Sequence, residues 1–230
     1  KEQFTSGNFA IEVIVTLDEN SKPKITDRAD GTILYKADDF MICTFVYDAG
    51  GTYGNIVTFR MNLDKNAGLI SVENQMTVNY NLYDGLPLYL AINYDALTMT
   101  MNGYIDYKKV VSKTILGATD PFFTLSDSPI LLGRSISNWN GDGWYKHIRL
   151  HDGNVTSKDM FGYNDEIGEE ILGSGKEVVN VNFNEDVNSN VSLDYSLNNN
   201  SCYFMGDSKI KKENGISYLN ITNEEKDAAY

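Results

Sequence analysis

The segment at residues 86–107, LPLYLAINYDALTMTMNGYIDY, constrains the fold most, because its apolar residues alternate along two consecutive runs. The alternating residues are Leu86, Leu88, Leu90, Ile92 and Tyr94 in the first run, and Leu97, Met99 and Met101 in the second. A period of two is typical of half-buried β-strands. Asp95-Ala96 is a tight connection, and Asn102-Gly103 predicts a hairpin turn, because both residues tolerate the positive φ of primed turns. The segment therefore predicts a three-stranded meander whose apolar face is the inner wall of a sandwich.

The charge of the 230-residue chain limits its partners. It has 19 Lys and Arg against 32 Asp and Glu, which gives a formal net charge of −13. Nucleic-acid binding needs a basic surface, so the charge argues against a nucleic-acid partner and also against anionic membranes. No apolar run approaches the roughly 18 residues of a membrane span, so we expect no membrane insertion. A neutral ligand such as a sugar, or a bound cation, is compatible with this charge.

Short strands are predicted along the whole chain, and breaks containing Gly, Asn or Asp separate them. Besides the meander they are expected at 9–15, 32–36, 40–47, 56–61, 69–72, 76–82, 112–116, 130–132, 177–183, 191–195, 202–205 and 216–221. Helical signal is confined to residues 156–161, where Thr156 is a capping residue, and to residues 166–172. This pattern predicts an all-β fold, a two-sheet antiparallel sandwich with one or two short helices.

The two cysteines, Cys43 and Cys202, are too few for a disulfide scaffold. They either form a single bridge or remain buried thiols. The sequence has no Cys-x-x-Cys pair and no Cys/His cluster, which argues against a zinc site. The first residues, KEQFTSGNF, lack the apolar segment of a signal peptide, which leaves a mature form, an excised fragment and an unsecreted protein all open.

Several segments resemble, in order and spacing, the laminin G-like type of the concanavalin A-like jelly roll, the superfamily of lectins and glucanases. They are FAIEVIV at 9–15, AINYD at 91–95 with MTMNG at 99–103, ILLGR at 130–134 and GWYKHIRLH at 143–151, the last resembling the closing strand. The resemblance covers residues 1 to about 170. It implies a jelly-roll sandwich with a short helix after the closing strand.

One departure from this family concerns the domain boundary. The family usually begins with one or two strands before the one at residues 9–15, and residues 179–183 and 214–221 resemble that missing opening. Either residues 174–230 complete the sandwich formed by residues 1–173, or they start a following module. Sheet edges are generally covered, which favours closure within the chain. An edge left open would instead pair with a neighbouring subunit and give a homo-oligomer.

Candidate ligand-binding residues gather in the glycine-rich segment at residues 137–145, which holds both tryptophans of the chain. They are Trp139, Asn140, Asp142, Trp144 and Tyr145. Aromatic faces stack on the apolar faces of sugar rings, and Asn and Asp side chains bind the hydroxyl groups. The alternative is that the aromatic residues pack beneath the loop as part of the core.

Calcium is a common cofactor of the resembled family, in which loop carboxylates and carbonyls bind it. Its candidate ligands here are Asp142 with Asn140, and Asp48 in an Asp-Ala-Gly-Gly turn. The alternative for these residues is a role in turn formation, which is common for loop Asp and Asn.

Enzymatic activity is not expected. Glycoside hydrolases of this sandwich class need two carboxylates that flank the scissile bond. The sequence has no Glu-x-Asp-x-Glu pattern, and its adjacent acidic pairs, at 38–39, 169–170 and 224–225, lie in polar stretches typical of solvated surface. No Ser/His/Asp set stands out, and His147 and His151 lie on one predicted strand. We therefore predict no catalytic residues.

Two hypotheses of different kinds follow for the function. The first is a non-catalytic recognition or adhesion module that binds carbohydrate and belongs to a surface-exposed or extracellular protein. The second is a structural or assembly component, such as a bacteriophage virion, fibre or decoration protein, whose partner is another virion or cell-surface protein. The second hypothesis rests on analogy with folds that such proteins use.

Overall fold

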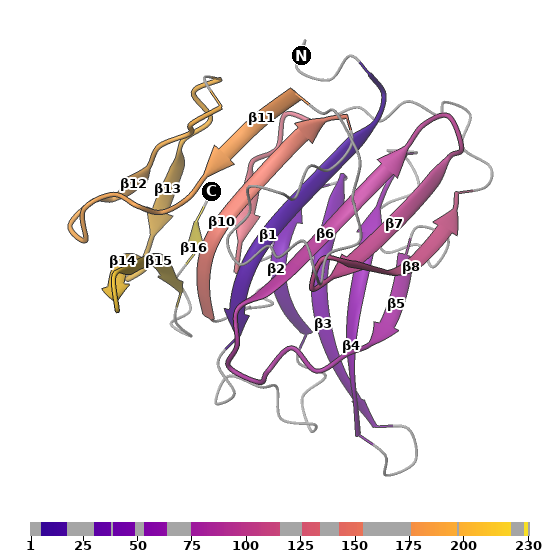
Figure 1. The fold of residues 1–230 in the computed structure, drawn as a ribbon, viewed down its shortest axis with the longest axis horizontal. Helices are drawn as coiled ribbons and strands as arrows, with labels where there is room; N and C mark the ends of the chain where they lie inside the picture. Colours follow the sequence, from indigo (N-terminus) through magenta and orange to yellow (C-terminus); the bar gives the residue numbers. More distant parts are fainter. Residues whose placement is uncertain are drawn as a thin grey trace.

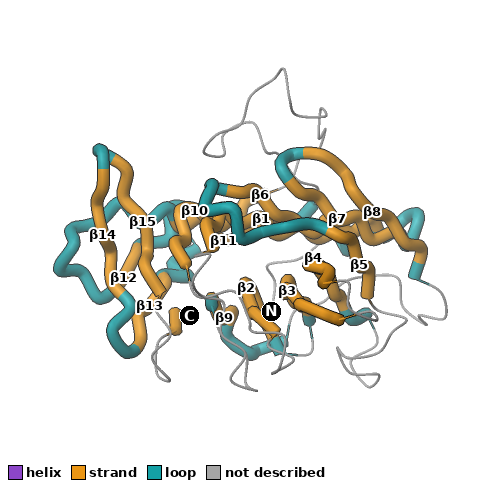
Figure 2. Tube along the Cα trace, turned by 90° about the horizontal axis from the view of Figure 1, so that it is seen from below, coloured by secondary structure: helices purple, strands orange, loops and turns teal. Residues whose placement is uncertain are grey.

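The structure is a computed structural model that describes residues 6–17, 30–37, 39–48, 53–63, 75–115, 126–133, 143–153, 176–196, 198–221 and 228–229. These residues form sixteen strands in two sheets, and none of them is helical. Figure 2 shows the two sheets as two facing layers. All pairings between the strands are antiparallel, so the predicted all-β, two-sheet sandwich is confirmed. The helices predicted at residues 156–161 and 166–172, and the strand predicted at 69–72, lie outside the described residues.

The first sheet has the strand order β14-β15-β10-β1-β6-β7-β8, and β11 also pairs with β10 (Figure 1). Its strands are β1 (Phe9–Leu17), β6 (Leu88–Asp95), β7 (Thr100–Ile105), β8 (Lys108–Thr114), β10 (Gly143–Asp152), β11 (Lys176–Val181), β14 (Lys209–Glu213) and β15 (Ile216–Ile221). One edge of β10 pairs with β1. The other edge pairs with β15 at residues 143–145 and with β11 at residues 148–152, so strands from the C-terminal third flank the centre of this sheet.

The second sheet has the strand order β12-β13-β16-β9-β2-β3-β4-β5. Its strands are β2 (Asp30–Lys36), β3 (Phe40–Asp48), β4 (Tyr53–Met61), β5 (Gln75–Asn79), β9 (Ile130–Leu132), β12 (Val191–Ser192), β13 (Cys202–Met205) and β16 (Ala228–Ala229). β3 lies between β2 and β4 in this sheet, and its sequence is apolar on both faces of the strand.

The hydrophobic core lies between the two sheets, where alternate residues of the strands meet. Phe9, Ile11, Val13 and Val15 of β1 are almost completely buried in it, as are Leu90, Ile92 and Tyr94 of β6. Phe9 stacks on Phe40 of the opposite sheet, with ring centroids 5.1 Å apart. The alternation predicted for these two strands is therefore confirmed, and it places the apolar face of the meander against the core.

The meander of β6, β7 and β8 is present, but both of its predicted turns were misplaced. Residues 96–99 form the first turn, in which Leu97 is 93% exposed and Met99 has φ +52°, so β7 begins only at Thr100. The prediction that Leu97 and Met99 belong to the strand was therefore wrong. Leu86 is also exposed and precedes β6.

The second turn of the meander lies at Asp106 and Tyr107, not at Asn102-Gly103. Asp106 and Tyr107 have φ values of +50° and +63°, as a primed turn requires. Gly103 lies inside β7, where a Cβ atom would come within 2.7 Å of the Phe59 ring. The glycine is therefore explained by close packing against the core, and the Asn-Gly pair was a false turn signal.

The outer edges of the first sheet are unsuited to pairing with another chain. The edge strand β8 carries Lys108, Lys109 and Lys113, and the edge strand β14 carries Lys209, Lys211 and Lys212. Lysines on an edge strand oppose intermolecular pairing. The free edge of β11 is covered by side chains, because Asn198 Nδ2 and Ser196 Oγ both donate to the carbonyl oxygen of Val178. Strand exchange between subunits is disfavoured at all three edges.

The two cysteines are buried and are not joined by a disulfide. Of the two alternatives that the sequence left open, the structure therefore has the buried thiols. Burial, with a smaller contribution from the Glu185 carboxylate, raises the pKa of the Cys202 thiol to about 12, so this thiol stays protonated at neutral pH.

Candidate functional site

A β-bulge in β10 decides which residues of the predicted site face outward. Two successive residues of β1 pair with His147 and Tyr145, so Lys146 is an extra residue in β10. An extra residue shifts the alternation of the strand by one position. Tyr145 consequently faces the core, whereas Trp144 lies on the outer face of the sheet and is 40% exposed.

Gly143 allows β10 to approach β1 closely beside this tryptophan. A Cβ atom at this position would lie 2.3 Å from the carbonyl oxygen of Thr16, much closer than any real contact. The glycine is therefore required by the spacing of the two backbones, which fixes Trp144 next to Thr16.

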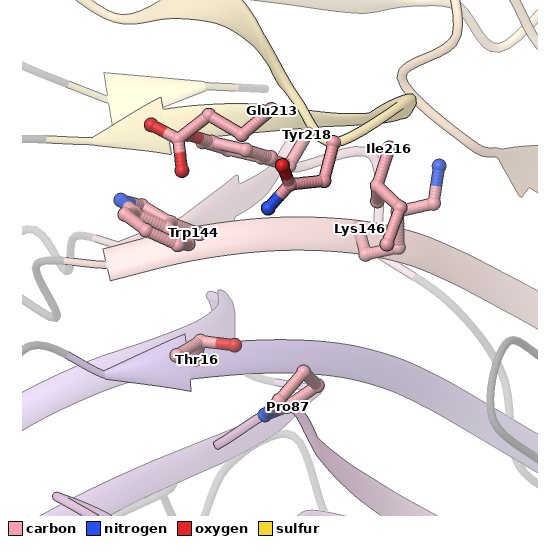
Figure 3. Close-up of a pocket in the computed structure, with 8 residues that line it drawn as sticks. Thr16, Pro87, Trp144, Lys146, Glu213, Ile216 and Tyr218 are labelled. Atoms are coloured by element: carbon pink, nitrogen blue, oxygen red, sulfur yellow. The ribbon is translucent and has the colours of Figure 1, made fainter. Parts of the chain in front are cut away.

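Trp144 forms the floor of a groove on the outer face of the first sheet. Its indole stacks on the ring of Tyr218 in β15, with centroids 4.5 Å apart and an interplanar angle of 19°. The groove has a volume of about 160 Å³ and is open to solvent. Its lining residues are Thr16, Pro87, Trp144, Lys146, Glu213, Asn214, Ile216 and Tyr218 (Figure 3).

The β14–β15 hairpin forms one wall of this groove. Its turn residues, Asn214 and Gly215, have φ values of +50° and +81°, the combination of a primed turn. The turn places Glu213 opposite Ile216 in the ladder. Figure 3 shows the Glu213 carboxylate above Trp144, while Thr16 and Pro87 line the other side of the groove.

Tyr218 is the most buried of the polar residues around the groove, with 4% of its surface exposed. Its hydroxyl group is inaccessible to solvent. Burial raises the pKa of Tyr218 to about 12, and the hydrogen bond to the Glu213 carboxylate and the charge of that carboxylate add to the effect. The hydroxyl therefore remains protonated and able to donate a hydrogen bond at neutral pH.

Lys146 contributes its aliphatic stem to the groove and directs its charge elsewhere. The ammonium group donates to Asn184 Oδ1 at 2.9 Å and to the carbonyl oxygen of Asn182 at 3.5 Å. Figure 3 shows the ammonium pointing away from Trp144. Partial burial lowers the pKa of this lysine, although the charge of Glu185 opposes the effect. The end of the groove at Trp144 is therefore bordered by a carboxylate rather than by a cation.

A buried ionic network holds β1, β6 and β10 together on the same outer face. Glu12 accepts hydrogen bonds from Tyr89 Oη at 2.7 Å and Arg149 Nε at 3.1 Å, and its Oε2 lies 2.7 Å from His151 Nε2. Glu12 and His151 are fully buried. Tyr89 in turn stacks on Tyr107, with centroids 4.1 Å apart. Because solvent does not reach Glu12, this network supports the sheet and is not a ligand site.

Of the ligand-binding residues predicted from the sequence, the structure brings one into the groove. Trp144 lines it, whereas Tyr145 is fully buried, and the prediction that Tyr145 contacts ligand is corrected to a role in the core. Trp139, Asn140 and Asp142 lie outside the described residues.

The partners of Trp144 in the groove, above all Tyr218 and Glu213, were not predicted from the sequence. The sequence feature that could have indicated these partners is the Asn214-Gly215 pair, which lies between a lysine-rich run and a run in which apolar residues alternate. It marks a hairpin next to these residues.

The predicted calcium site stays a prediction. Asp48 is the last residue of β3, and only its backbone is described, while Asn140 and Asp142 lie outside the described residues. Within the described ranges, no three His, Cys, Asp or Glu side chains converge as they would around a metal ion.

No protein-family model matches the sequence, and no curated protein is significantly similar to it. Solved structures are similar in fold. A candidate carbohydrate-binding protein from Bacteroides ovatus superposes with a TM-score of 0.52 and 14% identity, over 99% of this chain and 55% of its own. The chain thus spans about half the length of that protein. The chain has a concanavalin A-like jelly-roll fold.

Two further structures with this fold are less similar. A SAP-like pentraxin from Limulus polyphemus gives a TM-score of 0.45 and 9% identity, over 75% of this chain and 80% of its own. Domains LG4-5 of the mouse laminin α1 chain give 0.42 and 11%, over 77% of this chain and 42% of their own. The jelly roll expected from the resemblance is confirmed as a fold. Among its described residues, no helix has the length and apolar character to cross a membrane.

Proposed function

We propose that this jelly roll is a non-catalytic carbohydrate-binding module that holds one sugar ring in the groove over Trp144. The observation that carries the proposal is the half-exposed indole of Trp144, fixed by stacking on the buried ring of Tyr218. A fixed aromatic side chain offers an apolar face at low cost in conformational entropy. Thr16, Glu213 and Asn214 surround it with groups that bind hydroxyls. An apolar floor within a polar rim matches a sugar, whose ring has both kinds of surface.

The dimensions of the groove indicate a small ligand that binds weakly. Its volume of about 160 Å³ is below the ~300–1,000 Å³ of pockets that enclose drug-sized molecules. A hexose has about 12 non-hydrogen atoms, and at about 0.3 kcal/mol per atom its binding free energy is about 4 kcal/mol. This corresponds to a Kd of about 1 mM. Useful affinity would therefore come from multivalent display of the module or of the glycan.

The similarity to the candidate carbohydrate-binding protein of Bacteroides ovatus supports this function at the level of the fold. A binding role is also consistent with the acidic chain, because a neutral sugar does not oppose a net charge of −13. Glu12, which is fully buried, is occupied by three side chains and is closed to substrate. We place the module in a surface-exposed or extracellular protein, where glycans are displayed.

The test is a glycan-array screen of the protein displayed multivalently, carried out with calcium and again with a chelator. Binding to one or more neutral glycans is expected, and Trp144→Ala should abolish it. Tyr203→Ala is the matched control, because Tyr203 is also a half-exposed aromatic residue but lies on β13, outside the groove. Binding that survives Trp144→Ala, or no binding by the folded wild-type protein, would contradict the proposal.

A second candidate function is a structural or assembly component. The observation in its favour is the set of apolar side chains that remain exposed near β12 and β13, namely Leu193, Tyr203 and Met205. Light scattering after size-exclusion chromatography separates the two candidates. An assembly component should form a defined oligomer, and Tyr203→Lys should dissociate it, whereas a binding module should be monomeric.

A further inference from the structure

The two ends of the groove over Trp144 differ in polarity. At the Trp144 end the Glu213 carboxylate stands above the indole (Figure 3). At the other end, which we call the Ile216 end, the wall consists of the Ile216 side chain, which is 41% exposed, and the aliphatic stem of Lys146 (Figure 3). The Lys146 ammonium points away and donates to Asn184 Oδ1 at 2.9 Å. Ile216 and Lys146 therefore present carbon atoms to a ligand at this end.

Pro87 adds to this apolar surface from the opposite side of the groove. It is exposed, precedes β6 and lies across the groove from the β14–β15 hairpin (Figure 3). Single exposed apolar side chains are common on protein surfaces, but several that line one groove mark a ligand site. Trp144, Ile216 and Pro87 come from three separate parts of the chain and converge in this way. The ligand should therefore bring an apolar group besides the face of its ring.

We infer that the groove selects a 6-deoxyhexose, whose C6 methyl group packs against Ile216 while the ring lies on Trp144. The inference rests on the proposed function and names the class of sugar that the groove takes. An ordinary hexose carries a hydroxyl group on C6, and this group would leave water at the Ile216 end for contact with carbon atoms, which costs free energy. A methyl group at the same place gains free energy by burial. An acetamido group also carries a methyl, but its N–H and C=O groups would meet the same apolar wall.

The first experiment measures the affinity of the wild-type protein for pairs of sugars that differ only at C6. The pairs are L-fucose with L-galactose, L-rhamnose with L-mannose, and 6-deoxy-D-glucose with D-glucose, each titrated while the indole N–H signal of Trp144 is followed by NMR. In the pair with the highest affinity, the 6-deoxy sugar should bind at least about 4-fold more tightly, because burying one methyl group contributes about this factor. Equal affinities within every pair, or tighter binding of the hexose, would overturn the inference, as would tighter binding of N-acetyl-D-glucosamine than of any 6-deoxy sugar.

The second experiment tests whether Ile216 is the source of the preference. Ile216→Thr replaces part of the apolar wall by a hydroxyl group, which can form a hydrogen bond with a C6 hydroxyl, so the preference for the 6-deoxy sugar should fall below about 2-fold. Val110→Thr is the matched control, because Val110 is also β-branched, is 37% exposed and lies on β8, outside the groove. It should leave both affinities unchanged. A preference that survives Ile216→Thr would overturn the inference.

The outcomes separate this inference from the proposed function. If the sugars bind without preference and Trp144→Ala abolishes their binding, the proposed function stands and the inference fails. If the folded wild-type protein binds none of these sugars and no glycan, both fail.

Discussion

Replacement of Glu12 by Gln should destabilise the sandwich strongly, because it removes the charge at the centre of a buried network. Arg149, which is 1% exposed, would lose the charged partner that lies 3.1 Å from its Nε, whereas the carboxylate of Glu177, at 3.4 Å, belongs to a side chain that is one-third exposed. Removing one partner of a buried ion pair costs about 3–5 kcal/mol. For a chain of this size each kcal/mol lowers Tm by about 2–4 °C, so Tm should fall by about 6–20 °C.

Urea unfolding followed by circular dichroism measures this loss. Glu213→Gln is the matched control, because Glu213 is exposed and its replacement should change the free energy of unfolding by less than about 0.5 kcal/mol. The double variant Glu12→Gln/Arg149→Met should recover part of the loss, since it no longer buries an arginine without its carboxylate. A loss below about 1 kcal/mol in Glu12→Gln would refute the view that this network holds the three strands together.

The same network gives stability a defined pH dependence. Burial raises the pKa of Glu12, but the hydrogen bond from His151, the charges of Arg149 and His151 and the hydrogen bond from Tyr89 outweigh it, so the pKa lies below the usual 4.5. The unfolded chain therefore takes up this proton first as the pH falls. The contribution of Glu12 is complete above about pH 4.5 and is lost as the pH falls through the lower pKa of the folded state. Acid should therefore destabilise the wild type more than Glu12→Gln.

Two further predictions concern the sheet around the groove. Gly143→Ala should lower the free energy of unfolding by about 1–3 kcal/mol and weaken glycan binding, because its Cβ would collide with the backbone of Thr16. The control is Gly85→Ala, which should leave binding unchanged; φ there is +74°, but the space around the position is open. Deletion of residues 174–230 should prevent cooperative unfolding, because it removes β11 and β15 from β10 together with core residues such as Phe183 and Leu219. A truncated chain with a sharp unfolding transition would contradict this.

The central strands of the fold could be predicted from the sequence because their residues alternate with a buried face. β1 and β6 were found in this way, whereas β3 was predicted from a run of residues that is apolar on both faces. β14 and the first half of β8 were missed, since their lysines hide the alternation. Lysines at these positions protect an edge of the sheet from pairing with another chain. Whether a strand lies at an edge depends on the order of the strands in space and not on local sequence.

The two turns of the meander were misplaced for a similar reason, because contacts between residues far apart in the sequence decide where these turns lie. Gly103 lies within a strand because the Phe59 ring occupies the space of its side chain, and these residues are far apart in the sequence. The true turn at Asp106 and Tyr107 has no glycine. The positive φ of Tyr107 is tolerated where its ring stacks on Tyr89. Packing between strands therefore outweighed local turn propensity in deciding where the turns of the meander lie.

The candidate site could be predicted only in part. The sequence drew attention to Trp144 and Tyr145 together, but one extra residue in β10, Lys146, decides which of the two faces outward. A bulge of this kind leaves no signal in the alternation of a short strand. Tyr218 comes from a strand more than seventy residues later, and its place beside Trp144 follows from the pairing of β10 with β15.

The central claim, that a sugar binds over Trp144, is tested most directly by NMR of the tryptophan indole N–H groups. The chain has two tryptophans, Trp139 and Trp144, so two signals are expected, and Trp144→Phe assigns them. Titration with millimolar neutral hexose should shift the Trp144 signal along a saturable curve, together with backbone amides of β15 and the β14–β15 turn. A titration in which bound sugar shifts neither Trp144 nor these amides would contradict the account.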